Sequence, residues 1–486
     1  MYLAVIIFSI ICSSMLSAVD GVLDPTFNPG SAFSPSQPGT VITDFGNGED
    51  TAYAVLIQPA DQKIVLVGQV RNAAVENVFG LARYNPDGSL DSSFGIGGTV
   101  ITTQFSGSTN SGAIAAVLQP DGKIVAAGLA LNTISGFNEF AVARYNTDGT
   151  LDTSFNGTGL VTTATPGGNA EAQAVMILPG GTIVVGGFGF SGLTSVFTLA
   201  SYTTTGLLIG TVQQTPISNS SSSFINALAL DPVTGFLIAT GGAVMTAAPA
   251  VPRFATARYS NPTLGILDAT FNPGGSISTQ TQAGVVVTAM PSDGAATPSL
   301  GIAVAVQPDQ KILVGGTVNF FIGSGFVRYL PDGSLDTAFG PTGGRIVLPF
   351  TGVGGFDAVY EILLQADGKI IVAGTTNSQP GNAPQFFVGR YLTTGFVDPT
   401  FNPGSAVTGF NFTSVGGMIS EAFAATLQAD QKIILVGDVT DVPGGNFNFA
   451  AARYTNTVVS PVPPCPLLQT PRSDIIQAIM SKYCIC

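Results

Sequence analysis

Internal repetition constrains the fold of this chain more than any other feature of its sequence. A tripeptide that ends in tyrosine occurs seven times in the 486 residues. The seven copies are Ala82–Tyr84, Ala143–Tyr145, Ala200–Tyr202, Ala257–Tyr259, Val327–Tyr329, Gly389–Tyr391 and Ala452–Tyr454. Their mean spacing is about 62 residues, and self-similarity at a fixed period indicates a repeat architecture such as a solenoid or a propeller.

Two further motifs recur with a similar spacing. The consensus L-Q-P-D-G-K-I is clearest at 118–124 and returns, with changes, in the other units. The consensus L-D-x-[ST]-F, or a near variant, begins at Leu23, Leu90, Leu151, Leu267, Leu335 and Val397. In the second unit, Asp-Gly steps separate short apolar stretches, which is the pattern of consecutive antiparallel strands. These stretches are 113–119, 124–128, 140–145 and 159–163.

Four antiparallel strands in each unit are typical of the blade of a β-propeller. A solenoid is the alternative for any repeat array, but no capping unit is visible at either end of this one. The sequence therefore predicts an all-β fold, a seven-bladed β-propeller of four-stranded antiparallel blades over residues 19–459. Because the repeat begins out of phase with the blade, we expect the N-terminal strand at 40–44 to complete the last blade beside 449–454. That closure would remove a free sheet edge.

An arginine and an aspartate vary together between the units. Within the units the pairs are Arg83 and Asp91, Arg144 and Asp152, Arg258 and Asp268, Arg328 and Asp336, and Arg390 and Asp398. The one unit that has Ser201 in place of the arginine also lacks the aspartate. Arg453 has no following aspartate and Asp24 has no preceding arginine, so we expect these two to pair across the closure. The pattern predicts a charge-assisted contact within each blade, and the alternative is that both are separate, solvated turn residues.

The repeat resembles a known family. The segment at 143–155 reads A-R-Y-N-T-D-G-T-L-D-T-S-F, and together with the L-Q-P-D-G-K-I hairpin it is similar to the delta-60 repeat of bacterial secreted and surface proteins. The resemblance extends from about Leu23 to Tyr454 and implies a β-propeller outside the cell. It implies no catalytic residues.

The two ends of the chain differ from the repeats. Residues 1–18 resemble a secretory signal peptide cleaved near Ala18, and a buried strand or an uncleaved anchor is the alternative. The C-terminal tail at 460–486 contains a proline-rich linker, the pattern of a helix, and three cysteines, which are Cys465, Cys484 and Cys486. An intermolecular disulfide through the tail and incidental cysteines are both open. No transmembrane segment is expected in the mature chain, so we expect a secreted or cell-surface protein.

Charge and composition exclude several classes of function. The formal net charge of −13 argues against nucleic acid as a partner, because phosphate backbones are bound by basic surfaces. The chain has no histidine, which excludes Ser-His-Asp and Cys-His catalysis. Of the 16 lysines and arginines, all but five belong to the repeat motifs, and these five form no basic cluster.

Acidic residues precede the expected innermost strand in four units, at Asp50, Glu171, Asp357 and Glu421. Propellers commonly bind ligands at the mouth of the central channel, so these four are the candidate ligand-binding residues. A ring of carboxylates could hold a cation such as Ca²⁺ or bind sugar hydroxyls, and the alternative is solubilising charge on loops. No motif singles out an acid, a base or a metal ligand, so no catalytic residue, metal site or other cofactor is assigned.

These observations favour a secreted or cell-surface propeller that acts as a binding or adhesion scaffold for protein or carbohydrate. Enzymatic activity is open but less favoured. One alternative is an extracellular carbohydrate-active enzyme that uses carboxylates at the channel mouth. Another is a structural surface component cross-linked through the tail cysteines. A deep pocket that holds two carboxyls, one with a raised pKa, would favour the enzyme, whereas a shallow or closed channel would favour binding.

Overall fold

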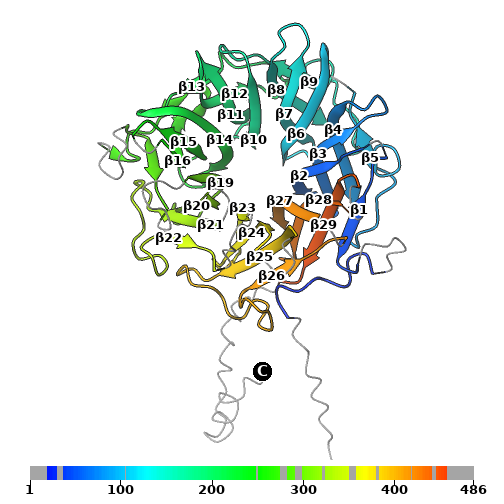
Figure 1. Ribbon diagram of the computed structural model, residues 1–486. Coiled ribbons are helices and arrows are strands. Elements are labelled where there is room, and N and C mark those ends of the chain that lie inside the picture. The colour runs from blue at the N-terminus through cyan, green and yellow to red at the C-terminus, as the bar shows by residue number, and fades with distance from the viewer. Residues whose placement is uncertain are drawn as a thin grey trace, which may run out of the picture.

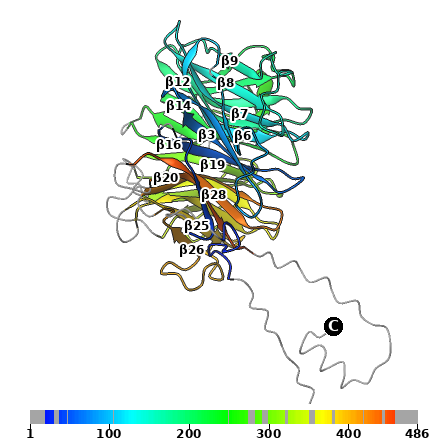
Figure 2. The same ribbon diagram turned by 90° about the vertical axis from the view of Figure 1, so that its right-hand side faces the viewer.

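Seven antiparallel sheets surround a central axis, as Figure 1 shows in face view and Figure 2 shows edge-on. The computed structural model describes residues 19–456, apart from gaps at 30–36, 47, 104, 248–249, 274–281, 291–297, 320–322, 350–356, 379–382, 417–418 and 441–444. The predicted all-β, seven-bladed propeller is confirmed. The predicted signal peptide at 1–18 and the cysteine-containing tail at 460–486 lie outside the described residues.

Each blade is named here by its order around the ring. Blade 1 contains β2 (Thr51–Ile57), β3 (Ile64–Arg71), β4 (Asn77–Tyr84) and β5 (Thr99–Ile101). Blade 2 contains β6 (Ser108–Leu118), β7 (Ile124–Asn132), β8 (Asn138–Tyr145) and β9 (Leu160–Thr163). Blade 3 contains β10 (Ala170–Ile177), β11 (Ile183–Ser191), β12 (Thr194–Tyr202) and β13 (Gln213–Thr215). Blade 4 contains β14 (Ser220–Leu230), β15 (Leu237–Met245), β16 (Pro252–Asn261), the 3-10 turn η1 (Pro262–Leu264), β17 (Ile266–Leu267) and β18 (Val285–Thr288).

The remaining three blades complete the ring. Blade 5 contains β19 (Ser299–Val306), β20 (Ile312–Val318), β21 (Gly323–Tyr329) and β22 (Arg345–Val347). Blade 6 contains β23 (Asp357–Leu364), β24 (Ile370–Thr376), β25 (Gln385–Tyr391) and β26 (Phe410–Thr413). Blade 7 contains β27 (Ile419–Leu427), β28 (Ile433–Thr440), β29 (Asn448–Tyr454) and the N-terminal strand β1 (Thr40–Thr43).

The first strand of each blade lies at the central channel. In every sheet the strands follow one another in the order of the chain, with two exceptions. In blade 4, β18 pairs with β16, and in blade 7, β1 pairs with β29 on the outside. Figure 1 accordingly shows β2, β6, β10, β14, β19, β23 and β27 around the central axis. The Q-P-D-G-K-I motif forms the turn between the first and second strands. In blade 2, for example, Gln119 N donates to Lys123 O at 2.9 Å while Gly122 adopts a φ of +83°, a conformation that favours glycine.

The tripeptide that ends in tyrosine ties blade 2 to both of its neighbours. Tyr145 of blade 2 is fully buried and hydrogen-bonds Thr102 of blade 1 through the two hydroxyl oxygens, 2.7 Å apart. In the opposite direction, Arg144 Nη1 donates to the backbone carbonyl of Thr204 in the outer turn of blade 3. The alanine between blades is small enough for the sheets to pack closely. One tripeptide therefore supplies a contact backward, a contact forward and a close fit.

We call the buried arginines, their aspartates and the adjacent phenylalanines the arginine girdle. In all six arginine-containing blades, Nε of the arginine lies 2.6–2.9 Å from Oδ2 of the aspartate. These six pairs are Arg83–Asp91, Arg144–Asp152, Arg258–Asp268, Arg328–Asp336, Arg390–Asp398 and Arg453–Asp24. Each guanidinium carbon also lies 3.8–4.8 Å from the centroid of a phenylalanine ring. These rings belong to Phe94, Phe155, Phe271, Phe339, Phe401 and Phe27.

Blade 3 has no such arginine. Ser201 occupies its position, and Ile209 N donates to Ser201 O at 2.7 Å, just as Asp152 N donates to Arg144 O in blade 2. The backbone of the turn is thus kept while both charged side chains are missing. Because arginine and aspartate are lost together, the buried charge of neither is left unpaired.

Blade 7 closes the ring with both ends of the described chain. β1 pairs antiparallel with β29, with Val41 opposite Ala451 and Ile42 opposite Ala450. Arg453 of β29 pairs with Asp24 from the N-terminal segment, with Nε 2.8 Å from Oδ2. The predicted closure of the last blade by the N-terminal strand is confirmed. β29 therefore has a paired strand on each side, β28 and β1, and its edge is covered.

The Asp-Gly turn that follows the third strand is formed in blade 7 by the two ends of the described chain, whereas in blade 2 it is one continuous segment. Asp20 O accepts a hydrogen bond from Asn402 N at 2.7 Å, as Asp148 O of the blade 2 turn does from Gly95 N at 2.9 Å. Gly21 adopts a φ of +79°, and Gly149 of the blade 2 turn adopts +88°. Asp20 and Gly21 therefore take the places of an Asp-Gly turn whose first half is supplied by the other end of the chain.

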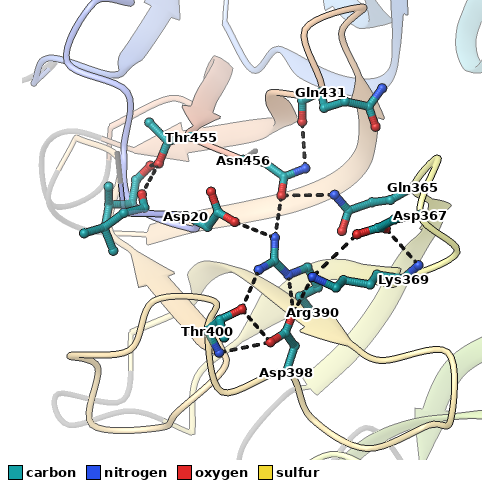
Figure 3. Close-up of polar contacts among 12 residues, drawn as sticks. Asp20, Gln365, Asp367, Lys369, Arg390, Asp398, Thr400, Gln431, Thr455 and Asn456 are labelled. Carbon is teal, nitrogen blue, oxygen red and sulfur yellow. Dashed lines mark hydrogen bonds and ion pairs between the residues drawn. The ribbon is translucent and has the colours of Figure 1, made fainter. Parts of the chain in front are cut away.

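Arg390 connects the two ends of the described chain to blade 6 (Figure 3). Its Nη1 donates to Asp20 Oδ2 and to Asn456 Oδ1, both at 2.8 Å, while its Nε donates to Asp398 Oδ2 at 2.8 Å. Thr455 Oγ1 also donates to Val19 O at 2.6 Å. The seventh turn is therefore held by side chains where a peptide bond would otherwise join the two halves. No helix within the described part of the chain is long and apolar enough to cross a bilayer.

Candidate binding site in the central channel

Every innermost strand carries a β-bulge at the same position. Its pairing with the second strand shifts by one residue, which leaves one residue of the inner strand unpaired. The seven unpaired residues are Tyr53, Ile114, Gln173, Asn226, Ile302, Tyr360 and Phe423. All seven line one cavity in the channel. The bulge thus re-aims one side chain per blade toward the axis, a known use of bulges near functional sites.

A glycine in the second strand makes each bulge possible. If it carried a Cβ atom, that atom would lie only 1.7–2.0 Å from a backbone carbonyl oxygen of the inner strand. The seven glycines are Gly68, Gly128, Gly187, Gly241, Gly316, Gly374 and Gly437. Each follows the isoleucine or leucine at the start of the second strand by four positions. That recurrence in the sequence could have revealed the bulges.

The cavity has a volume of about 650 Å³ and receives residues from all seven blades. Three of its aromatic side chains lie on consecutive blades, Tyr360 on blade 6, Phe423 on blade 7 and Tyr53 on blade 1. The centroid of the Phe423 ring is 5.2 Å from that of Tyr360 and 5.2 Å from that of Tyr53. We call these three residues the aromatic arc. The bulge residues of blades 3 and 4 are the amides Gln173 and Asn226, so one wall is aromatic and another is polar.

One position of the channel wall differs sharply between blades. The residue directly after the bulge is alanine in six blades, at Ala54, Ala115, Ala174, Ala227, Ala303 and Ala424. In blade 6 it is Glu361, which also lines the cavity. Burial raises the pKa of Glu361 to about 8, although the backbone N–H groups of Ile362 and Ala425 act in the opposite direction. The Glu361 carboxyl is therefore mostly protonated at neutral pH. Sequence analysis missed this residue, and an alignment of the seven inner strands would have singled it out.

A second acidic group lies behind the aromatic arc. Asp438 of β28 is opposite Glu421 of β27 and accepts a hydrogen bond from Thr51 Oγ1 at 2.8 Å on Oδ2. Its side chain is almost fully buried, and Oδ1 has no hydrogen-bond partner among the described residues. Burial raises the pKa of Asp438 to about 8, and the nearby Glu421 and Glu49 carboxyls contribute to the rise. Sequence analysis missed Asp438 as well, because it follows the bulge glycine on the second strand.

The tyrosines of the arc respond to the same charges. Burial raises the pKa of Tyr53, and the negative charges of Asp438 and Glu421 raise it further. Burial likewise raises the pKa of Tyr360, together with the charges of Glu421 and Asp438. The two carboxyls are therefore close enough to the arc to act on it electrostatically.

The four predicted ligand-binding acids are not brought together. Asp50 and Asp357 are fully buried and bound by protein groups. Asp50 accepts from the N–H of Phe45 at 3.0 Å, while Asp357 accepts from the hydroxyl of Ser378 at 2.6 Å. These two carboxylates therefore support the packing of their loops.

Glu171 and Glu421 occupy equivalent positions on β10 and β27, two residues before the bulge and on different blades. Glu171 accepts from the amide of Asn138 at 3.3 Å, and burial raises the pKa of both glutamates. Of the four predicted residues, only Glu421 raises the pKa of the arc tyrosines through its charge, and it lies two residues before Phe423 on β27. Within the described ranges, no group of three or more acidic or cysteine side chains is placed to hold a metal ion.

Comparisons with known proteins agree with this architecture. Four segments, at 60–94, 119–155, 307–339 and 365–401, match a family model described as a domain of unknown function (DUF5122) β-propeller. With the seven blades observed here, the match defines the chain as a β-propeller repeat protein. Among curated proteins, none matches the sequence.

The chain is similar to several solved structures at low sequence identity. The polysaccharide lyase Uly1 has a TM-score of 0.51 and 12% identity, with 90% of this chain and 96% of the lyase chain covered. The α-L-arabinofuranosidase Arb93A from Fusarium graminearum has a TM-score of 0.43 and 11% identity, with 71% and 93% covered. Sqt1 from Chaetomium thermophilum has a TM-score of 0.39 and 10% identity, with 84% and 97% covered. At 12% identity, the likeness to the lyase extends to the fold and to no residue of the site.

Proposed function

We propose that this protein is a carbohydrate-binding propeller that takes its ligand in the central channel. The observation that carries the proposal is the aromatic arc inside a cavity of about 650 Å³, a volume in the range of ligand sites. Aromatic rings supply flat apolar surfaces at a low cost in conformational entropy, and the C–H faces of sugar rings pack on such surfaces. The amides of Gln173 and Asn226 and the Glu361 carboxyl provide hydrogen-bonding groups for hydroxyls. A polysaccharide lyase with a similar fold is compatible with this proposal but supplies no residue of it.

The direct test is a glycan array followed by calorimetric titration of each hit. Phe423 contacts both tyrosines of the arc, so Phe423→Ala should weaken binding at least about tenfold, equivalent to about 1.4 kcal/mol. Phe396, which is 53% exposed and lies outside the cavity, gives the matched control Phe396→Ala, for which we expect unchanged affinity. Binding of no glycan, or full binding by a folded Phe423→Ala variant, would overturn the proposal.

A second candidate, a carbohydrate-active enzyme, is favoured by Glu361 itself. A carboxyl that is protonated at neutral pH can serve as a general acid, as in glycoside hydrolysis. The cavity and the raised pKa of Glu361 are two features expected of such an enzyme. Polysaccharides incubated with the protein would be assayed for new reducing ends and for new unsaturated ends. If the wild type forms new ends and Glu361→Gln does not, catalysis is established. If the protein binds the polysaccharide but forms no product, only the binding function is supported.

The location of the protein outside the cell is part of the same proposal. It rests on the signal-like segment at 1–18 and on the family resemblance of the repeat. N-terminal sequencing of the protein recovered from culture medium would test it, and we expect the chain to begin close to Val19. Recovery of the protein only inside the cell, with Met1 intact, would contradict the proposal.

A further inference from the structure

We propose that the channel prefers a carbohydrate that carries free ammonium groups over neutral or anionic sugars of the same length. The inference rests on the proposed carbohydrate-binding function and names its ligand class. It is drawn from three features of the channel, which are its aromatic arc, its buried carboxyls and the position of the basic side chains of the protein.

The basic residues of the described chain are mostly committed elsewhere. Six arginines belong to the arginine girdle, and five lysines pair with the same aspartates. No lysine or arginine of the described residues lines the cavity. Arg71, at the end of β3, lies close to an acidic side chain, with Nη2 3.9 Å from Glu49 Oε2, and does not line the cavity. An anionic sugar would therefore meet carboxyls in the channel without a dedicated basic partner, and its burial would be unfavourable.

The acidic groups are concentrated beside the aromatic arc. Glu361 lines the cavity next to Tyr360. Glu421 lies two residues before Phe423 and opposite Asp438, and Asp438 accepts a hydrogen bond from Thr51, two residues before Tyr53. Aromatic faces attract cations through their quadrupole, most strongly where water is excluded. An arc of three rings backed by carboxyls is therefore suited to an ammonium group. The net charge of −13 adds a long-range attraction for cationic ligands.

Asp438 supplies an independent observation. It is 4% exposed, and its Oδ1 has no hydrogen-bond partner among the described residues. Asp438 is not among the residues that line the cavity, so it would act on a bound cation through its charge and not by direct contact. A neutral sugar would gain nothing from that charge, whereas an ammonium group would be attracted by it.

Calorimetry with three tetrasaccharides tests the inference. The probes are the glucosamine tetramer, the fully N-acetylated tetramer as a matched neutral control, and a galacturonate tetramer as the anion. We expect the glucosamine tetramer to bind at least about tenfold more tightly than the acetylated one at low salt. This preference should decrease as salt rises. A preference of this kind that survives only at low salt would still support the inference.

Two variants locate the effect. Glu361→Gln and Asp438→Asn should each reduce the ratio of the affinity for the glucosamine tetramer to the affinity for the acetylated tetramer by at least about threefold. Asp121→Asn removes one charge from the exposed turn of blade 2 and should leave the preference unchanged. Thermal unfolding of each variant would show that the fold is intact.

Proton exchange gives a second readout. A bound cation favours the ionised forms of Glu361 and Asp438, so binding near neutral pH should release protons. The groups that face them include Glu421, Glu49, Tyr53 and the hydroxyl of Thr51. Titrations in two buffers with different ionisation enthalpies would measure this release, and its absence for the glucosamine tetramer would contradict the inference.

The outcomes separate this inference from the proposed function. Equal or tighter binding of the acetylated or galacturonate tetramer would overturn the inference and leave carbohydrate binding standing. Failure of all sugars, with binding of an oligolysine peptide instead, would overturn both the inference and the proposed function.

Discussion

The arginine girdle and the channel wall belong to the same blades but differ in what they keep constant. In the girdle, the side chains repeat almost unchanged in six blades, and each makes the same contacts. In the channel wall, the bulge repeats in all seven blades while its side chain ranges from Ile114 to Gln173 to Phe423. A repeated side chain with repeated contacts indicates a structural role. A repeated backbone that presents different side chains indicates the surface on which a ligand would be distinguished.

The repeated bulge of the channel wall depends on the glycine in the second strand of each blade. Gly187→Ala would place a Cβ atom 1.9 Å from Glu171 O, a distance that requires the bulge or the strand pairing to be lost. We expect the free energy of unfolding to fall by more than about 4 kcal/mol, the exceptional range for single substitutions. Differential scanning calorimetry would measure the change.

The matched control is Gly404→Ala, because a Cβ at Gly404 would have no atom within 4 Å. Its stability should stay within about 0.5 kcal/mol of the wild type. If Gly187→Ala were as stable as Gly404→Ala, the bulges would not depend on glycine, and the channel wall would not be the constant backbone described here.

The structural role of the arginine girdle is tested best in blade 4. Asp268 pairs with Arg258, and no lysine shares this aspartate because Phe236 stands where five other blades have lysine. Arg258→Ala should therefore cost about 3 kcal/mol, since it leaves a buried carboxylate with only hydroxyl and N–H donors. The double variant with Asp268→Ala should lose less than Arg258→Ala alone. In blade 5, Arg328→Ala should cost less than Arg258→Ala, because Lys311 Nζ lies 3.5 Å from Asp336. Equal urea midpoints for the Arg258→Ala single and double variants would contradict a buried pair.

The difference between the two regions also explains how much the sequence could predict. Motifs that recur at a constant spacing predict the number of blades, the closure by the strand at 40–44 and the association of each arginine with an aspartate. The channel site does not recur, because Glu361 and Phe423 are single departures within a repeated frame. Asp438 comes from the second strand, so its approach to Tyr53 depends on how blades 7 and 1 pack together. Distances between blades are set by the whole ring, and no local pattern encodes them.

The two regions should also respond to pH in opposite directions. Burial alone would raise the pKa of Asp152, but hydrogen bonds from Ser154 and Lys123 outweigh it and lower the pKa. The girdle therefore contributes stability above about pH 4 that is lost in acid.

Glu361 has its pKa raised from 4.5 to about 8, so the folded state binds a proton that the unfolded state releases. Its contribution therefore falls as pH rises from about 4.5 to about 8. Glu361→Gln removes this slope, and its stability relative to the wild type should rise by on the order of 3 kcal/mol between pH 5 and pH 8. Unfolding curves at both pH values would measure the change, and a constant difference would show that Glu361 ionises normally.

The smallest effect is expected from the lysines at the rim of the girdle. Lys123 Nζ lies 2.9 Å from Asp152 Oδ2, but its side chain is 28% exposed, and Asp152 keeps Arg144 Nε at 2.7 Å when the lysine is removed. Lys123→Ala should therefore cost only about 0.2–1 kcal/mol, and less at high salt, as measured by thermal unfolding. Blade 4 already shows that the pair can form without lysine, because Arg258 and Asp268 are 2.6 Å apart in its absence. A loss as large as that of Arg258→Ala would mean that the lysine, and not the buried arginine, holds the aspartate. The girdle would then be a solvent-exposed ion-pair network, and the distinction between a fixed outer frame and a variable channel wall would have to be drawn on different grounds.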